Sequence, residues 1–188
     1  MTDRRIQKSN RALLDASFQV LLKNPHASLS EVAKQAEVGR ATLYRHFPTR
    51  ENLIKAIAIE SLQLIKNSMT PIVTSDLQGK AAIHRMVKVL LPIADRFHFL
   101  QMIWTLVEFD QQVWRLYEEQ MATIKCWILQ GQRQGVLNPD LAADWIVSVL
   151  DSMLYSASWI IANNMMETTQ IEQQLLQTLF EGIQSNEA

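Results

Sequence analysis

The stretch SLSEVAKQAEVGRATLYRHFPTREN, residues 28–52, determines the fold class because it predicts two short helices joined by a tight turn. Ser28 and Glu31 have the spacing of a capping box, in which hydroxyl and carboxylate each accept a backbone amide proton. A helix is therefore expected to begin directly after Ser28. The break around Glu37 leaves room only for a turn before a second helix over about residues 40–47.

The second helix would present a face suited to DNA. Leu43 and Phe47 are four residues apart, so both can face a core. The other positions spread hydrogen-bond donors, a small methyl group and two certain positive charges over the remaining surface. In a major groove, Arg contacts guanine edges, Thr and Ala methyls meet thymine, and Tyr or His holds phosphates. The sequence therefore predicts a recognition helix.

Three segments in this order resemble the TetR family of transcriptional regulators. Residues 13–23, LLDASFQVLLK, are similar to that family's first helix; residues 42–47, TLYRHF, to its recognition helix; and residues 48–57, PTRENLIKAI, to the start of its fourth helix. The resemblance implies an all-α protein of about nine helices. A helix-turn-helix DNA-binding domain is expected over residues 1–48, followed by a helical regulatory and dimerisation domain over residues 49–188.

The resemblance also implies which side chains contact a double-stranded DNA operator. Arg40 and Arg45 would reach base edges or flanking phosphates, two roles that the sequence does not divide between them. Tyr44 has an alternative role, because its ring could brace the helix against the core. The positions expected at DNA are Ser28, Gly39, Arg40, Ala41, Thr42, Tyr44, Arg45, His46 and Arg50.

Two residues depart from the family pattern. Glu37 occupies a turn position where the family commonly has Gly, and Gly39 stands where a helix-starting Ser is common. A left-handed Glu37 would cost on the order of 1 kcal/mol, and its carboxylate would face a polyanion if it pointed outward. The displaced glycine could instead let the turn rearrange.

Charge is distributed unevenly along the 188 residues. Residues 1–55 hold ten Lys or Arg and five acids, whereas the remainder holds eight basic and fourteen acidic residues. Exposed charges act over about 8 Å at physiological salt, so a total of -1 does not oppose DNA binding by the basic end. The single cysteine and the polar N-terminus favour a soluble cytoplasmic protein.

Few breaks interrupt the rest of the chain, which has only five glycines and five prolines. No stretch shows the alternation of a strand, so helices are the expectation throughout. Thr49 can cap a fourth helix, and Pro92 should end or kink the fifth. Residues 97–107 are apolar nearly all round and predict a short buried helix. Further helices are expected over about 80–91, 110–134, 140–163 and 169–184.

The last two helices offer a candidate dimer interface. A stripe of small residues lets another helix approach closely, and Ser148, Ser152 and Ser156 recur every fourth residue. The alternative is packing within one subunit. In the TetR family these helices pair two subunits, which implies a homodimer on a palindromic site. The expected interface residues are Trp145, Ser148, Val149, Ser152, Ser156, Trp159, Leu175, Leu176, Leu179 and Phe180.

The tryptophans, all after residue 68, indicate an effector pocket. Gln101, Thr105 and Glu108 share one helical face by spacing, and Glu108 among Trp rings would suit a cationic or hydrogen-bonding apolar effector. A solvated face is the alternative. The candidate residues are Phe97, Gln101, Trp104, Thr105, Glu108, Trp114, Tyr117 and Met121. By the family's mechanism, effector binding would tilt the fourth helix and release the operator.

No catalytic constellation is present in the sequence, so an enzyme is not expected. His84 and His98 lack a second ligand at helical spacing, Cys126 has no nearby His, and no glycine-rich phosphate loop occurs. No metal or cofactor is therefore expected. Two alternatives to an effector-controlled repressor stay open: a DNA-binding protein controlled by a partner or acting architecturally, and an all-helical interaction module.

Overall fold

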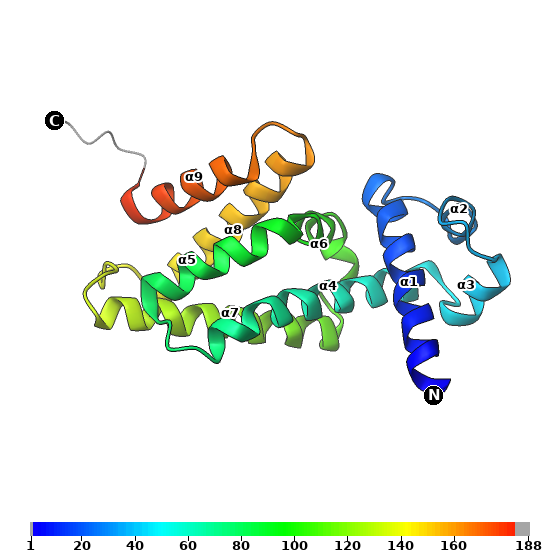
Figure 1. Cartoon of the computed structure of the whole chain (residues 1–188), viewed down its shortest axis with the longest axis horizontal. Helices are drawn as coiled ribbons and strands as arrows, with labels where there is room; N and C mark the ends of the chain where they lie inside the picture. The colour runs from blue at the N-terminus through cyan, green and yellow to red at the C-terminus, as the bar shows by residue number, and fades with distance from the viewer. Residues whose placement is uncertain (1, 183–188) are drawn as a thin grey trace. The chain divides into compact units, whose positions relative to one another are not determined.

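A computed structural model describes the backbone of residues 2–182 and the side chains of residues 11–182. This part of the chain contains helices and no strand, which confirms the all-α prediction (Figure 1). Its nine α-helices and one 3-10 helix are α1 (Thr2–Lys23), α2 (Leu29–Gln35), α3 (Arg40–His46), α4 (Arg50–Val73), α5 (Gly79–Leu90), η1 (Leu91–Ile93), α6 (Ala94–Val107), α7 (Gln111–Arg133), α8 (Ala143–Ala162) and α9 (Thr168–Glu181).

Most helix ends lie close to the predicted ones, and the exceptions have local causes. The turn at Pro92 is a 3-10 helix that leads directly into α6, so α6 begins at Ala94, before the predicted residue 97. It is not buried all round, because Leu106 on its outer side is 61% exposed. Helix α4 continues through Pro71 to Val73. The predicted last residues of α9, 183 and 184, lie outside the described residues.

The chain forms two compact units, and the division differs from the predicted boundary at residue 48. The first unit contains residues up to 61 together with 99–114, and the second contains 62–98 and the residues from 115 onward. Helices α4 and α7 each run from one unit into the other. The first half of α4 belongs to the first unit because its apolar residues are buried there.

A shared apolar core holds the first unit together. The Phe18 ring of α1 meets the Phe99 ring of α6 edge-on, with centroids 5.3 Å apart. Leu43, Leu53 and Ile57, from α3 and α4, are completely buried. Burial of each such side chain stabilises the fold by roughly 1.5 to 3 kcal/mol. The short helix α3 is therefore fixed by tertiary packing rather than by its own length.

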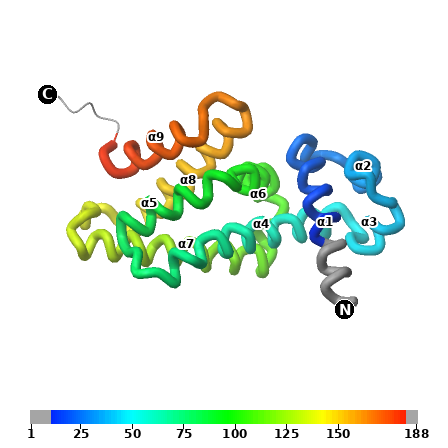
Figure 2. The backbone as a smooth tube through the Cα atoms, viewed as in Figure 1, coloured from blue at the N-terminus to red at the C-terminus, as the bar shows by residue number. Residues whose placement is uncertain are grey.

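The second unit is a helical bundle in which α9 packs on both α5 and α8 (Figure 2). Ile83 and Met86 of α5 and Leu150 of α8 are fully buried. Helix α5 buries one stripe, as its spacing predicts, and exposes the opposite side. This bundle supplies the framework for the sites of the second unit.

Candidate nucleic-acid interface and regulatory sites

The predicted capping box starts α2. The amide of Glu31 donates to Ser28 Oγ at 3.2 Å, and the amide of Ser28 donates to Glu31 Oε2 at 2.7 Å. The hydrogen bonds from Ser28 hold the pKa of the Glu31 carboxyl below its usual range. Thr49 caps α4 as predicted, because its Oγ1 accepts from the amide of Asn52 at 3.2 Å. These two local signals place both ends of the helix-turn-helix segment.

The turn between α2 and α3 places Glu37 in the left-handed region, with φ of 56°. The Val38 amide closes the turn by donating to the carbonyl of Ala33 at 3.0 Å. Gly39, in contrast, has φ of -62° and ψ of 128°, and it serves as the N-cap of α3 without a side-chain hydrogen bond. The glycine is thus displaced from the position that requires its conformational freedom.

Helix α3 is attached through its inner face and leaves its polar face open. Leu43 is completely buried, whereas Arg40, Ala41, Thr42 and Arg45 are exposed. Among the residues that the structure describes, Arg40, Thr42 and Arg45 have no side-chain partner within the protein. His46 is half-buried, and its ring centroid lies 6.3 Å from that of Phe47. The arrangement offers donors and positive charge without rearrangement of the protein.

Two of the residues expected at DNA also make contacts inside the protein. The hydroxyl of Tyr44 lies 3.2 Å from Ser30 Oγ, so Tyr44 braces α3 against α2 while 43% of the residue stays exposed. The Arg50 guanidinium donates to the backbone carbonyls of Pro25 and Ala27. Arg50 therefore fastens the loop that precedes α2, in place of the open phosphate-facing orientation that was expected.

An ion pair within the first unit links α4 to the start of α7. Lys55 Nζ lies 2.6 Å from Asp110 Oδ2. Asp110 Oδ1 also accepts from the amides of Gln112 and Val113, at 3.0 and 3.2 Å, and so caps α7. The hydrogen bond from Lys55 is the main cause that lowers the pKa of Asp110. One carboxylate therefore holds two helices at one point.

The structure does not bring the eight predicted effector residues into one unit. Gln101, Trp104, Thr105, Glu108 and Trp114 belong to the first unit, and Phe97, Tyr117 and Met121 belong to the second. Trp104 and Trp114 do meet, with ring centroids 6.3 Å apart. Gln101 and Thr105 are exposed on α6, which fits the solvated face considered as the alternative. Shared helical spacing did not determine which side of α6 is buried.

A half-buried polar cluster in the second unit joins Phe97 and Tyr117 to two residues that the sequence reasoning missed. The Tyr117 hydroxyl donates to Asp151 Oδ2 at 2.9 Å, and the Tyr155 ring meets the Phe97 ring edge-on at 6.5 Å. Burial raises the pKa of Asp151, although the Tyr117 hydrogen bond opposes this shift. Burial also raises the pKa of both tyrosines. The sequence signal that could have indicated this cluster is Asp151 itself, an acidic residue on the apolar helix segment between Leu150 and Leu154.

Helix α8 exposes a row of tryptophans and serines. Trp145 and Trp159 are 62% and 50% exposed, and Ser148, Ser152 and Ser156 lie on the exposed side between them. Each serine hydroxyl donates to a backbone carbonyl four residues earlier, at 2.8 to 3.0 Å. By length and composition alone α8 could cross a membrane, which is weak evidence for one helix, and 33% of its most apolar window is buried.

The four predicted interface residues of α9 differ in their burial. Leu175 and Leu176 are 5% and 8% exposed, because they pack in the core of their own subunit. Leu179 and Phe180 are half-buried and line a cavity described below. The exposed side of α9 is polar instead, and it includes Gln173 and Gln177. The leucine band therefore holds α9 on its own bundle.

The potential metal ligands and the cysteine do not form a metal or catalytic site within residues 11–182. No group of three His, Cys, Asp or Glu within residues 11–182 could hold a metal ion. Cys126 is a free, exposed cysteine on α7. The polar face of α3 and the half-buried cluster of Asp151 and Tyr117 are therefore the arrangements considered for function. Together they define a helix-turn-helix DNA-binding protein joined to a helical second unit.

Comparison with known proteins places this class more closely. Residues 13–57 match the family of bacterial regulatory proteins called the tetR family. The chain is 42% identical over 52 residues to the transcriptional repressor LfrR of Mycolicibacterium smegmatis, a match that spans 28% of each chain. It is 24% identical over 147 residues to the transcriptional regulator NfxB of Pseudomonas aeruginosa, covering 76% of this chain and 77% of NfxB.

The fold extends the likeness over nearly the whole chain. The structure of LfrR in complex with proflavine superimposes with a TM-score of 0.78 at 21% identity, covering 96% of this chain and 99% of that one. The Bacillus subtilis regulator FadR in complex with stearoyl-CoA gives 0.71 at 18% identity, covering 93% and 100%. Residues 13–57 therefore carry a DNA-binding domain of the tetR family, and the chain as a whole has the fold of the transcriptional regulators LfrR and FadR.

Proposed function

We propose that the chain is a repressor that binds a palindromic operator as a homodimer and is released by a small, largely apolar cation. The observation that carries the DNA part is the open polar face of α3, held in place by the buried Leu43. Arg40, Thr42 and Arg45 would enter the major groove, with Tyr44 and His46 at flanking phosphates. The proposed place of action is the cytoplasm, where the operator DNA lies.

Operator binding is tested with an inverted repeat from the DNA flanking the gene. Arg40→Ala should weaken specific binding by roughly 1 to 3 kcal/mol, as expected for loss of a base contact. Arg85→Ala is the control, because Arg85 is an exposed arginine of α5 in the second unit. Unchanged specific affinity across Arg40→Ala, Arg45→Ala and Tyr44→Ala would overturn the recognition-helix assignment.

The spacing of the exposed residues of α8 supports the proposed dimer. Positions 145, 149, 152, 156 and 159 alternate in steps of four and three, the spacing of a coiled-coil seam. Since the serine hydroxyls already donate within the helix, a second copy could bury them without leaving orphan donors. A hollow of about 130 Å³ between α8 and α9, lined by Ser156 and Gln174, would receive a side chain of the partner.

The effector site proposed is the cluster of Asp151, Tyr117, Tyr155 and Phe97. A desolvated carboxylate is costly unless a positive charge joins it, and aromatic rings attract cations through their faces. A planar aromatic cation would therefore gain both interactions here. Phe97 and Tyr117 stay from the prediction, whereas Asp151 takes the role first given to Glu108. The LfrR complex with proflavine, a planar cationic dye, supports this class of effector.

The effector proposal is tested by titrating the protein with proflavine and following operator release. Asp151→Asn preserves the acceptor for Tyr117 but removes the charge, and it should weaken proflavine binding at least about tenfold. Asp144→Asn is the matched control, because Asp144 is an exposed aspartate of the same helix that pairs with Lys125 at 2.6 Å. Operator binding that no cationic ligand alters would favour the alternative in which a partner protein, not a small molecule, controls this regulator.

Release would run through α4, which begins in the first unit and ends in the second. The Lys55–Asp110 ion pair ties this helix to the start of α7, whose residue Tyr117 belongs to the proposed effector cluster. A displacement of α7 by the effector would thus also displace α4. A coupling free energy of roughly 1 to 3 kcal/mol suffices for a useful switch.

A further inference from the structure

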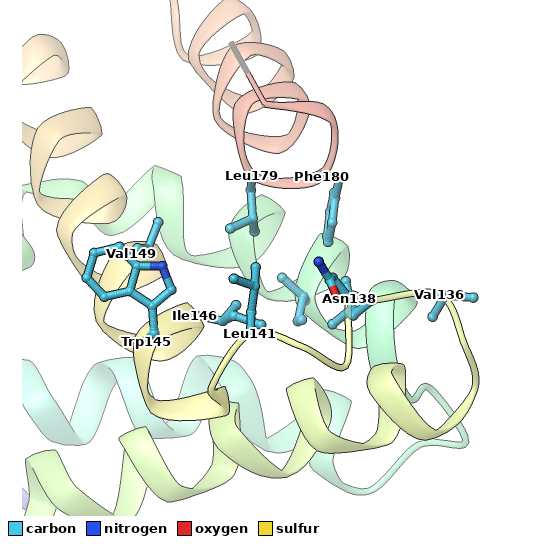
Figure 3. A pocket seen from close by; sticks show the side chains of 10 residues that line it. Val136, Asn138, Leu141, Trp145, Ile146, Val149, Leu179 and Phe180 are labelled. Atoms are coloured by element: carbon cyan, nitrogen blue, oxygen red, sulfur yellow. The ribbon is translucent and has the colours of Figure 1, made fainter. Parts of the chain in front are cut away.

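A cavity of about 220 Å³ lies in the second unit, at the loop that joins α7 to α8 (Figure 3). Its walls come from α5, this loop, the start of α8 and the end of α9. Leu179 and Phe180 point into it from α9, and the Asn138 side chain lies below Phe180 (Figure 3). None of the four residues of the Asp151 cluster lines it, so the cavity is a different site.

Hydrogen bonds and close packing hold the loop that forms the cavity wall. Gln132 Nε2 donates to the carbonyls of Asn138 and Leu141, at 2.8 and 2.7 Å. Leu137 packs directly on Gly131, where an added Cβ would lie 2.7 Å from Leu137 Cδ1. Glycine is therefore required for this approach. The cavity is a preformed feature of the loop rather than a chance gap between mobile side chains.

The size and lining of the cavity define a class of ligand. Nine of the ten lining residues are apolar, and Asn138 is the exception. An apolar cavity of about 150 Å³ is enough to bind benzene, so the larger volume here suits one aromatic ring with a polar substituent. Lys80 Nζ lies 4.6 Å from the centroid of the Phe180 ring, and no lining residue is acidic. The electrostatic preference is therefore for an anion.

We propose that this cavity binds small aromatic carboxylates. The ring would pack among Leu141, Trp145 and Phe180, and the carboxylate would accept a hydrogen bond from the Asn138 amide. Lys80 is outside the lining and would add electrostatic attraction from beside the Phe180 ring. This ligand is opposite in charge to the proposed effector and uses other residues. Because Trp145 and Val149 also belong to the proposed dimer seam, a ligand in the cavity would alter pairing of the subunits. That effect on pairing rests on the proposed function, whereas binding of the carboxylate does not.

The binding test compares benzoate, benzyl alcohol and benzylammonium, which share one ring and differ in charge. The full-length protein is titrated while the indole N–H signal of Trp145, assigned with Trp145→Phe, is followed by NMR. Benzoate should shift this signal and bind about tenfold more tightly than benzylammonium, with benzyl alcohol between them. The signal of Trp104, which belongs to the first unit and lies outside both the lining and the proposed seam, should not move.

Two pairs of variants test the location. Leu141→Trp fills the cavity and should abolish benzoate binding, whereas Leu129→Trp, at a leucine of similar exposure outside the lining, should not. Lys80→Met should weaken benzoate about threefold and leave benzyl alcohol unchanged, with Lys88→Met on the same helix as its control.

Some outcomes would overturn the site. They are an unmoved Trp145 signal with all three compounds up to about 10 mM, tighter binding of benzylammonium, or unaltered benzoate binding by Leu141→Trp. Asp151→Asn separates this site from the proposed effector site. It should weaken proflavine binding and leave benzoate binding intact, so that failure of either proposal is recognised independently of the other.

Discussion

Helices α3 and α8 both leave a row of side chains exposed, but they differ in whether the polar side chains of that row already have hydrogen-bond partners within the protein. The side chains of Arg40, Thr42 and Arg45 on α3 have no partner within the described protein. On α8, each serine of the exposed row already donates to its own backbone. The first surface has unused donors for a polar, charged ligand, whereas the serine hydroxyls of the second already donate within the helix and are suited to contact with another apolar surface.

The largest expected effect tests the dry character of α8. Ser152→Lys would place an unpaired charge in the middle of the proposed seam, next to the same charge from the second copy. The dimer should weaken by about 3 kcal/mol or more, over a hundredfold in dissociation constant. Analytical ultracentrifugation measures this change. Ser152→Ala should leave the dimer intact, and a dimer that survives Ser152→Lys would show that α8 is not the seam.

The next largest effect concerns Asp151, on the inner side of α8, and the dependence of folding stability on pH. Burial raises the pKa of Asp151, so this group stabilises the fold fully below the unfolded pKa, about 3.9, and the contribution is lost as pH rises through its folded pKa. Asp151→Asn should therefore raise stability at pH 7 by about 0.5 to 2 kcal/mol, typical of neutralising a strained functional group. Chemical denaturation at several pH values should show the gain disappearing below about pH 4. The exposed Asp144→Asn should show no such gain.

At the entrance to α3, Glu37→Gly should relieve the left-handed strain. The free energy of unfolding should rise by about 0.5 to 1 kcal/mol, and DNA affinity should increase at low salt because a negative charge is lost. Glu37→Gln separates the two effects, since it removes the charge but keeps a side chain at positive φ. Equal stability of Glu37→Gly and Glu37→Gln would mean that the backbone conformation costs nothing here.

Gly39→Ser should produce the smallest change. A Cβ at position 39 would lie 3.5 Å from Thr42 Oγ1, an ordinary contact, and a serine hydroxyl could accept from an amide of the first turn. Relative to glycine, the gain should be about 0.3 kcal/mol in thermal or chemical unfolding. Gly39→Ala supplies a Cβ without a cap and should not stabilise. A gain for alanine equal to that for serine would assign the effect to the backbone instead.

Much of the first unit could be predicted because its signals are local. The capping box at Ser28, the cap at Thr49 and the inward Leu43 each depend on residues within one or two helical turns. The positive φ of Glu37 was also foreseen as one of two conformations for the turn. The two compact units divide elsewhere than at the expected residue 48, because packing of α6 against α1 joins residues far apart in the sequence.

The sites of the second unit depend on tertiary packing, which periodicity does not encode. Spacing placed Gln101 and Thr105 on one face of α6 but could not tell that this face is exposed, and Glu108 lies in the turn that follows the helix. The reverse occurred on α9, where Leu175 and Leu176, which were assigned to an interface, are core residues. Asp151 meets Tyr117 across 34 positions, a pairing that only the folded bundle creates.

The strained turn at Glu37 also has a genetic consequence. Both glutamate codons become glycine codons by a single A-to-G transition, so the change that relaxes the turn is one mutational step away. Cells selected for tighter control of the operator should reach this substitution early and repeatedly, whereas new base contacts on α3 would need rarer changes. An increase in DNA affinity is thus expected to arise first in the turn between α2 and α3, before any change on α3 itself.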